Sequence, residues 1–289
     1  MNFGRVTKTG RVAIVATALA LVAAGCGDAT SEVEAETDAT RVISLSPAAT
    51  EMLFAIGAGD QVIAVDEYSN FPENAPTTDL SGFSPNLEAI SSYDPDLVVL
   101  SSFADAIVPQ LNTLHIPTYV AADNPSEITD VYDQIVDLGN LTGRSTEAED
   151  LVERMTDFLD KIAADAPQRS TPLTYYIELD DTYWTYTSAS IVSALFERVG
   201  LRNIVDDEDL VATQLSAEAI VQANPDVIFL TNSNFGVTPE VVADRPGWSN
   251  IAAVEQGHVF ELVSDIASRW GPRLVDLLDI VVEKTSQIR

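Results

Sequence analysis

Short apolar runs alternate with longer amphipathic stretches along most of the chain. The runs are bounded by proline, glycine, asparagine and aspartate, a pattern that predicts buried β-strands. The longer stretches, in which apolar residues return every three or four positions, predict α-helices. We expect strands at 41–45, 61–65, 97–100, 118–121, 173–179, 227–230 and 259–263. We expect helices at 47–57, 86–91, 108–114, 126–141, 145–164, 190–199, 217–222 and 272–283. Such alternation is typical of an α/β fold with largely parallel sheets.

One pattern occurs twice in the sequence, 130 positions apart. Residues 88–99 read Glu-Ala-Ile-Ser-Ser-Tyr-Asp-Pro-Asp-Leu-Val-Val, and residues 218–229 read Glu-Ala-Ile-Val-Gln-Ala-Asn-Pro-Asp-Val-Ile-Phe. Each copy predicts the end of a short helix, a Pro-Asp turn and a buried strand. The spacing is far longer than the period of a solenoid, which is roughly 20–50 residues. This echo therefore predicts two similar lobes with a cleft between them.

The longest expected helix, 145–164, has the pattern of a bridge between the lobes. Thr146 and Glu149 fit a capping box, and Pro167 follows the expected end of the helix. Its single apolar stripe consists of Leu151, Met155, Phe158, Leu159 and Ile162. We therefore predict two similar α/β lobes with central, mostly parallel sheets, joined by one long bridging helix, with a ligand cleft between the lobes. The predicted boundaries are 41–143 and 168–289 for the lobes and 144–167 for the bridge.

The first 25 residues have the pattern of a targeting segment. Arg5, Lys8 and Arg11 precede an apolar run at 12–24, which is too short to span a bilayer as a settled helix. The run ends in Val-Ala-Ala-Gly followed by Cys26, the only cysteine, and this junction resembles a bacterial lipobox. The resemblance implies a signal peptide at 1–25 and lipidation of Cys26; the alternative is an ordinary secretory signal with an incidental cysteine. Residues 26–40, rich in Asp, Glu, Thr and Ala, predict a flexible tether.

The charge of the chain limits its partners. The formal net charge is −30, and loss of residues 1–25 would remove three positive charges and leave 12 basic against 45 acidic residues. Such a surface repels nucleic acid and anionic membranes, so we expect membrane attachment through lipid alone. An acidic, highly solvated surface suits saline surroundings, and an acidic face that meets a basic partner is a second interpretation.

Sequence motifs for catalysis or for a bare metal ion are absent. The chain has no Gly-x-Ser-x-Gly elbow, no Gly-x-x-x-x-Gly-Lys loop and no His-Glu-x-x-His. His115 and His258, the only histidines, lie at expected strand entrances, where a structural role is favoured. We therefore expect no catalytic residue, no cofactor and no metal-ligating set, and a bare metal-ion receptor is a weak alternative.

Several motifs, in order and spacing, resemble the substrate-binding proteins of iron–siderophore and vitamin B12 ABC importers. They are Val-Ile-Ser-Leu-Ser-Pro-Ala-Ala-Thr-Glu-Met-Leu-Phe-Ala-Ile-Gly at 42–57, the turn at 66–72, Arg-Pro-Gly-Trp at 245–248 and Ser-Arg-Trp-Gly-Pro-Arg at 268–273. The similarity runs from about residue 41 to the C-terminus. It implies two lobes bridged by one helix, and a monomeric receptor at the outer face of the cytoplasmic membrane. Such a receptor delivers an iron chelate or a corrinoid to a permease dimer driven by a cytoplasmic ATPase.

The same resemblance implies a role for the glutamate that heads each copy of the echo. In vitamin B12-binding members of this family, a glutamate on each lobe meets arginines of the permease, in the sequence context of Glu88 and Glu218. Two equivalent carboxylates suit a two-fold symmetric partner. The alternative is that both glutamates merely favour the first turn of a helix through its dipole.

The expected cleft residues follow the carboxyl ends of strands, where ligands bind in α/β folds. They are Tyr68, Phe83, Ser101, Phe103, Trp184, Tyr186, Asp265, Arg269 and Trp270. The resemblance matches Tyr68, Asp265 and Arg269 to cobalamin-contacting positions. Phe83, Ser101 and Ala212 stand where those relatives have tryptophan. We expect Trp184 and Trp270 to supply replacement aromatic walls.

Structural roles are the alternative for several of these residues. Phe83 and Phe103 would then be core, and Arg269 an inter-lobe or surface salt bridge, while Trp248 and Arg273 are expected to be structural. The sequence does not separate siderophore, cobalamin and haem as the ligand.

Overall fold

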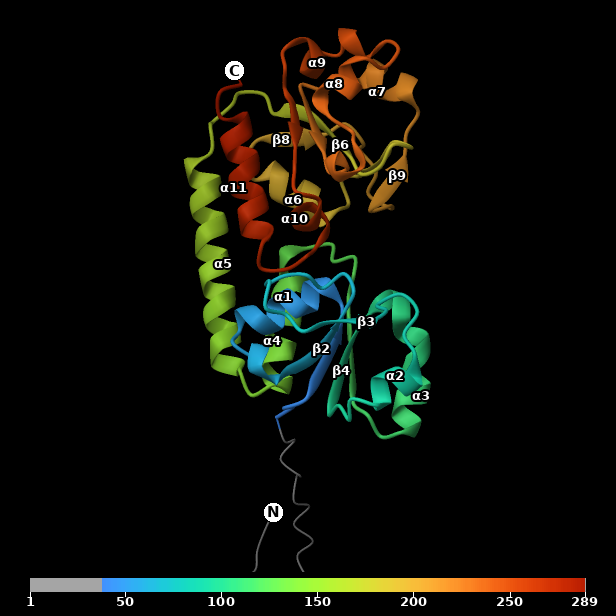
Figure 1. The fold of residues 1–289 in the computed structure, drawn as a ribbon. Helices are drawn as coiled ribbons and strands as arrows, with labels where there is room; N and C mark the ends of the chain where they lie inside the picture. Colours follow the sequence, from blue (N-terminus) through green and yellow to red (C-terminus); the bar gives the residue numbers. More distant parts are fainter. Residues whose placement is uncertain (1–37, 289) are drawn as a thin grey trace, which may run out of the picture. The chain divides into compact units, whose positions relative to one another are not determined.

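A five-stranded parallel sheet forms the centre of the first lobe in the computed structural model, which describes residues 38–288 (Figure 1). Its strand order is β3-β2-β1-β4-β5. The strands are β1 (Val42–Leu45), β2 (Val62–Asp66), β3 (Thr77–Leu80), β4 (Leu97–Ser101) and β5 (Thr118–Ala121). Every pairing in this sheet is parallel, so the carboxyl ends of all five strands lie at one edge.

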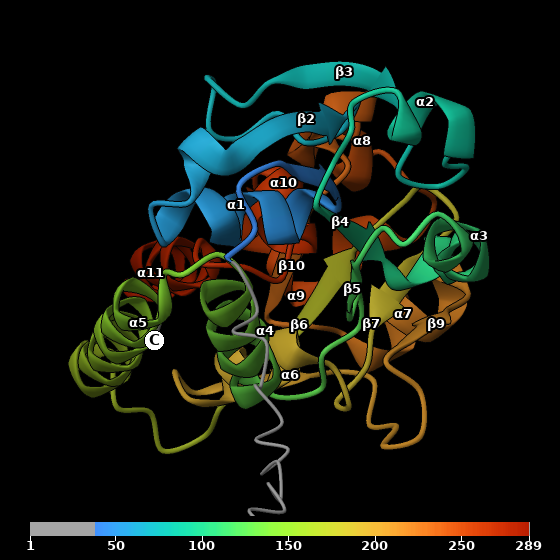
Figure 2. The ribbon, with the colours of Figure 1, turned by 90° about the horizontal axis from the view of Figure 1, so that it is seen from below.

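Helices cover both faces of this first sheet. On one face lie α1 (Pro47–Ala55) and α4 (Ile128–Leu141), and on the other lie α2 (Leu87–Ser91) and α3 (Val108–Thr113) (Figure 2). Alternate residues of a strand enter different cores: Leu97 and Val99 pack with α1 and α4, whereas Val98 and Leu100 pack with α2 and α3. Burial on both faces explains why these strands read as continuous apolar runs.

The second lobe repeats this plan with a four-stranded parallel sheet in the order β11-β10-β6-β8. Its strands are β6 (Leu173–Glu178), β8 (Leu201–Asn203), β10 (Val227–Leu230) and β11 (Val259–Glu261). One face packs on α6 (Ile191–Glu197) and α11 (Leu274–Thr285), and the other on α7 (Ala217–Ala223), α8 (Pro239–Ala243) and α9 (Ala252–Glu255). A separate antiparallel pair joins β7 (Trp184–Tyr186) to β9 (Ala212–Gln214). The short helix α10 (Ser264–Ser268) precedes α11.

The long helix α5 (Ser145–Asp165) runs alongside both lobes (Figure 1). It packs against α4 of the first lobe and α11 of the second, which confirms the predicted bridge. Two details differ from expectation. The helix begins after Arg144 without a side-chain cap, so the capping box predicted at Thr146 and Glu149 is wrong. Phe158, predicted in the buried stripe, is 53% exposed.

The two copies of the echo occupy equivalent places in the two lobes. In each, a short helix with a side-chain N-cap, Asn86 or Ser216, leads to a central strand, β4 or β10. Both copies turn through left-handed backbone at the same position, Asp94 with φ 52° and Asn224 with φ 49°. The echo therefore encodes one structural unit used twice.

The aspartate of each Pro-Asp turn ties the echo to the first strand of its lobe. The Asp96 carboxylate accepts the backbone N–H groups of Thr40 at 3.0 Å and Arg41 at 2.9 Å, just before β1. The Asp226 carboxylate accepts the backbone N–H and the hydroxyl of Thr174, each at 2.8 Å, at the start of β6. The aspartate at the equivalent position of each copy thus fixes how two neighbouring strands align, β1 with β4 in the first lobe and β6 with β10 in the second.

The strands that hydrophobic patterning missed are short or polar. Strand β3 reads Thr-Thr-Asp-Leu and lies at the edge of its sheet, so it needs no continuous apolar run. The segment that carries Trp184 and Tyr186, for which no strand was expected, contains β7, which pairs with β9.

The predicted signal peptide 1–25, Cys26 and most of the tether lie outside the described residues. Among residues 38–288, no helix is long and apolar enough to cross a membrane.

Candidate functional site

A cavity of about 430 Å³ lies at the carboxyl ends of the first sheet, where loops of both lobes meet. This edge is where ligands bind in open α/β sheets. The first lobe contributes Leu45, Pro47, Asp66, Tyr68, Gly82, Phe83, Ser101, Phe103 and Asp123, and the second contributes Asp265, Ser268 and Arg269. Six of the nine predicted cleft residues, Tyr68, Phe83, Ser101, Phe103, Asp265 and Arg269, are therefore brought together.

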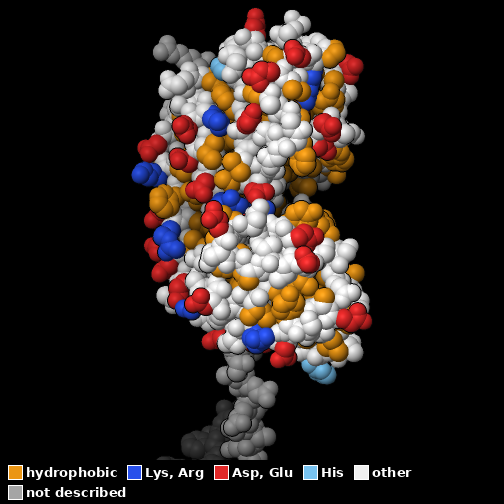
Figure 3. Space-filling view, in the orientation of Figure 1, with side chains coloured by type: hydrophobic (Ala, Val, Ile, Leu, Met, Phe, Trp, Pro, Cys, Tyr) orange, Lys and Arg blue, Asp and Glu red, His pale blue; other side chains and the backbone are white. Residues whose placement is uncertain are grey.

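Three exposed aromatic side chains form one wall of this cavity. The rings of Tyr68 and Phe83 pack edge-to-face with centroids 5.9 Å apart, and the ring centroids of Phe83 and Phe103 are 6.3 Å apart. Their exposed fractions are 54%, 65% and 63%, which excludes the core role considered for Phe83 and Phe103. Hydrophobic side chains gather on both sides of the notch between the lobes (Figure 3). An uncovered aromatic wall of this kind is typical of a site for a large, partly apolar ligand.

Asp66 ends β2 and forms a polar part of the cavity. Its carboxylate accepts the backbone N–H of Tyr68 and the hydroxyl of Ser69, both at 2.8 Å. Burial raises the pKa of Asp66 above its ordinary value, although these hydrogen bonds oppose the shift. Asp66 belongs to the 66–72 turn but was not predicted as a site residue.

Asp123 follows β5 and organises the loop that carries Phe103. Its Oδ2 accepts the hydroxyls of Ser101 and Ser102, both at 2.6 Å, and the backbone N–H of Phe103 at 3.3 Å. Ser101 is therefore engaged with the protein itself. Asp123 was not predicted; its place directly after the expected strand 118–121 was the available signal.

Arg269 lines the cavity while its guanidinium bonds across to the first lobe. Its Nη1 donates to Asn70 Oδ1 at 2.7 Å and its Nη2 to the Tyr68 carbonyl at 2.9 Å. Nη2 also lies 3.1 Å from Asp265 Oδ2, and Nη1 3.4 Å from Glu51 Oε1. The inter-lobe salt bridge, which the sequence left open for this residue, is present in the structure.

A second inter-lobe ion pair joins Glu51 of α1 to Arg273, just before α11. Arg273 Nε donates to Glu51 Oε2 at 2.8 Å, and a further bond joins Arg273 Nη2 to Glu51 Oε1. The expectation that Arg273 is structural is therefore confirmed. Glu51 was not predicted as a site residue, although an acidic residue directly before the apolar segment Met-Leu-Phe-Ala of α1 was a signal of a buried partner.

Three predicted cleft residues do not line this cavity. Trp270 is 8% exposed and packs edge-to-face against Tyr186 with ring centroids 5.5 Å apart, so the wall predicted from it is core packing. Tyr186 is likewise packed on the core shared by both lobes. Trp184 in β7 is partly exposed but is not among the lining residues.

The Arg-Pro-Gly-Trp motif builds the interior of the second lobe. Arg245 makes two bonds, of 2.6 and 2.8 Å, to the buried carboxylate of Glu178, and its guanidinium lies 4.6 Å from the Trp248 ring centroid. Trp248 is fully buried, which confirms its expected structural role.

Glu88 and Glu218 are not among the residues that line the cavity. Each is exposed in the first turn of its short helix, α2 or α7. Within residues 38–288, no group of three or more His, Cys, Asp or Glu side chains is placed to hold a metal ion.

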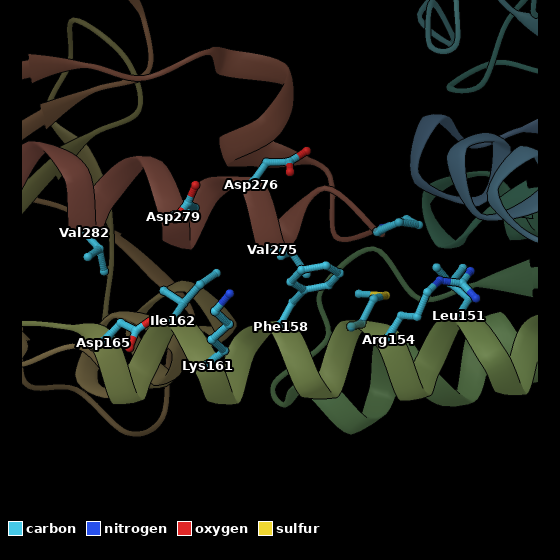
Figure 4. Close-up of a pocket in the computed structure, with 12 residues that line it drawn as sticks. Leu151, Arg154, Phe158, Lys161, Ile162, Asp165, Val275, Asp276, Asp279 and Val282 are labelled. Atoms are coloured by element: carbon cyan, nitrogen blue, oxygen red, sulfur yellow. The ribbon is translucent and has the colours of Figure 1, made fainter.

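A larger hollow of about 550 Å³ lies between α5 and α11, away from the sheet edges (Figure 4). Arg154, Phe158 and Lys161 of α5 and Val275, Asp276 and Asp279 of α11 line it, with Phe158 next to Val275. Because it lacks both the strand ends and the aromatic wall, we assign the functional site to the cavity between the lobes.

Comparison with known proteins agrees with this geometry. The family model described as "Periplasmic binding protein" matches residues 42–266. An uncharacterized ABC transporter substrate-binding lipoprotein, YvrC, of Bacillus subtilis is 30% identical over 84% of this chain and 79% of its own length. A cobalamin-binding protein of Halobacterium salinarum is 28% identical over 83% of this chain and 68% of its own. The crystal structure of the periplasmic vitamin B12-binding protein of Vibrio cholerae matches with a TM-score of 0.70 at 25% identity, covering 87% of this chain and 99% of that one.

Proposed function

The chain belongs to the periplasmic binding protein family, and we propose that it is the extracytoplasmic receptor of an ABC importer for a corrinoid. This family transports solutes and is not a family of enzymes. The observation that carries the proposal is the aromatic wall of Tyr68, Phe83 and Phe103 in a cavity bounded by both lobes. The relatives named for cobalamin or vitamin B12 support a corrinoid as the ligand.

An iron chelate is the second candidate ligand. The same exposed aromatic wall suits the apolar faces of a siderophore complex, and the cavity again supplies a few polar groups for orientation. The two candidates differ in shape and charge, so direct binding measurements separate them.

Substitution of Phe83 by alanine tests the proposed wall. The ring is 65% exposed and contacts two aromatic neighbours, so Phe83→Ala should weaken binding of cyanocobalamin about tenfold through lost contact area. Phe158→Ala is the matched control, because Phe158 is a similarly exposed phenylalanine in the hollow between α5 and α11. Equal affinity of both variants and the parent protein, measured by calorimetric titration, would contradict this role of the wall.

We further propose that Glu88 and Glu218 dock the receptor onto its permease. Both are exposed, both head equivalent helices, and each belongs to a different lobe. This equivalence suits arginines on the two halves of a two-fold symmetric permease, through charge-assisted hydrogen bonds.

The paired charge reversal Glu88→Arg and Glu218→Arg should abolish uptake of the ligand into cells while calorimetric affinity stays unchanged. Reversal of Glu149 and Glu153, two exposed glutamates of α5, makes the same change in total charge and should leave uptake intact. Uptake that persists in the first pair would disprove the docking role.

Lipidation of Cys26 is proposed to hold the receptor at the outer face of the cytoplasmic membrane. The net charge of −30 would not favour an anionic bilayer, so lipid has to supply the attachment. The parent protein should partition into a detergent phase and Cys26→Ser into the aqueous phase. Aqueous partition of both would favour an ordinary secretory signal.

A further inference from the structure

The cavity between the lobes has an unbalanced set of charges. Among its lining residues are three carboxylates, Asp66, Asp123 and Asp265, and one guanidinium, that of Arg269. Within residues 38–288, Asp66 and Asp123 form no ion pair with Lys, Arg or His; their hydrogen-bond donors are backbone N–H groups and serine hydroxyls. The lining therefore carries more negative than positive charge.

The single guanidinium is already occupied by groups of this protein. Both terminal nitrogens of Arg269 have two partners each: Asn70 and Glu51 for Nη1, and the Tyr68 carbonyl and Asp265 for Nη2. Its side chain is only 10% exposed. A ligand carboxylate or phosphate would have to displace these inter-lobe bonds before Arg269 bound it in two-point fashion.

The remaining carboxylates are held in place by the fold. Two serine hydroxyls and the Phe103 N–H fix Asp123, so it cannot swing away from the aromatic wall without breaking three bonds. Asp66 is fixed at the end of β2 by Tyr68 N–H and Ser69. Fixed negative groups beside an apolar wall favour a cation or a neutral hydrogen-bond donor and disfavour an anion.

We propose that this cavity selects ligands without net negative charge, namely neutral or cationic corrinoids and hydroxamate-type chelates, and rejects anionic chelates such as ferric tris-catecholates. The inference rests on the proposed function, because it names the charge class of the ligand at the same site. It is also consistent with the whole chain, whose net charge of −30 slows the approach of anions.

A pair of ligands that differ only in charge tests the inference. Cyanocobalamin is neutral overall, and hydrolysis of one peripheral carboxamide to a carboxylate adds one negative charge with almost no change of shape. Calorimetric titration at low salt should show roughly tenfold weaker binding of the carboxylate derivative, and the difference should shrink as salt screens the charges. Equal or tighter binding of the carboxylate derivative would overturn the inference and leave the corrinoid function standing.

Variants identify which groups are responsible. The double variant Asp66→Asn with Asp123→Asn keeps amide oxygens as acceptors and should bring the ratio of the two affinities close to one. The double variant Asp276→Asn with Asp279→Asn, on exposed residues of α11, makes the same change in charge far from the cavity and should keep the tenfold ratio.

Failure of the two proposals gives different results. If neither corrinoid binds, a cationic ferric hydroxamate with a free amine and its neutral N-acetylated form replace them as the matched pair, with a ferric tris-catecholate as the anion. Binding of the hydroxamates alone would refute the corrinoid assignment and support the selection of ligands without net negative charge. Binding of the catecholate alone, or of none of these ligands, would refute both.

Discussion

Glu51 lies on the buried side of α1, where it is only 3% exposed, and its carboxylate forms ion pairs that join the two lobes. Arg273 donates to both of its carboxylate oxygens, and Arg269 lies 3.4 Å from one of them. The two arginines belong to the second lobe and the glutamate to the first. A buried pair of this kind is strongly destabilised when one partner is removed, because the other charge then lacks compensation. Glu51 is therefore placed to fix the angle between the lobes.

We predict that Glu51→Gln lowers the free energy of unfolding by about 2–4 kcal/mol, because it leaves Arg273 without a carboxylate partner in a largely buried position. Urea unfolding followed by circular dichroism measures the change. Glu149→Gln, at an exposed position of α5, should stay within about 0.5 kcal/mol of the parent protein. A loss at Glu51 no larger than this control would show that the pair does not hold the lobes together.

At the scale of elements, the echo is the clearest link between sequence and structure. The two copies were identified from residue types alone, and the structure places both as a capped helix, a left-handed turn and a central strand. Hydrophobic patterning did not reveal the role of the aspartate in each turn, Asp96 or Asp226. Its partners, Thr40 and Arg41 in one lobe and Thr174 in the other, lie 52 to 56 positions away, beyond the reach of any local pattern.

We predict that Asp96→Asn costs about 1 kcal/mol at neutral pH, a value that allows for the solvent exposure of this carboxylate. Burial opposes ionisation of Asp96, but the backbone N–H groups of Arg41 and Thr40 outweigh it and lower its pKa below the ordinary 3.8. Since the folded-state pKa is lowered, the contribution is present above the unfolded-state value and is lost as the pH falls through the folded-state value.

The difference in the free energy of unfolding between Asp96→Asn and the parent protein should therefore be largest near neutral pH. It should disappear in acid, below the ordinary pKa of 3.8. Urea midpoints measured across this range give the result. A difference that stays constant into acid would mean that the charge of the Asp96 carboxylate does not strengthen its hydrogen bonds to Thr40 and Arg41.

The strands explain why part of the fold and of the site was predictable from the sequence. Strands buried on both faces, such as β4 and β10, appear as apolar runs, and the carboxyl ends of parallel strands point to one edge, which located Tyr68 and Phe103. Phe83 follows β3, which patterning missed, and only the family resemblance marked its position. Trp270 and Tyr186 were misplaced because the sequence around an isolated aromatic residue does not show whether its ring lines a cavity or packs in the core. Asp66 and Asp123 were missed because their importance depends on partners brought close by folding.

At the scale of the whole molecule, the acidic surface sets the response to salt. The chain has 45 acidic and 15 basic residues, and most of the acidic side chains are exposed. Repulsion among like charges destabilises a compact state, and salt screens it over a Debye length of about 10 Å at 0.1 M and about 3 Å at 1 M.

We predict that the melting temperature rises by about 5 °C or more when KCl is raised from about 0.05 M to about 1 M, because screening relieves this repulsion. Differential scanning calorimetry measures the shift. Glucose at the same osmolality is the control for general solvent effects and should give a smaller rise. An unchanged or lower melting temperature in KCl would refute the interpretation of the surface as suited to saline surroundings.

Corrinoid binding in the cavity between the lobes can be measured in solution. The experiment is isothermal titration of the purified protein with cyanocobalamin, a neutral ferric hydroxamate, a ferric tris-catecholate and haem. We expect one site per chain for cyanocobalamin, with micromolar or tighter affinity, and no measurable binding of the catecholate. Absence of cyanocobalamin binding, alongside tight binding of haem or the catecholate, would contradict the corrinoid assignment.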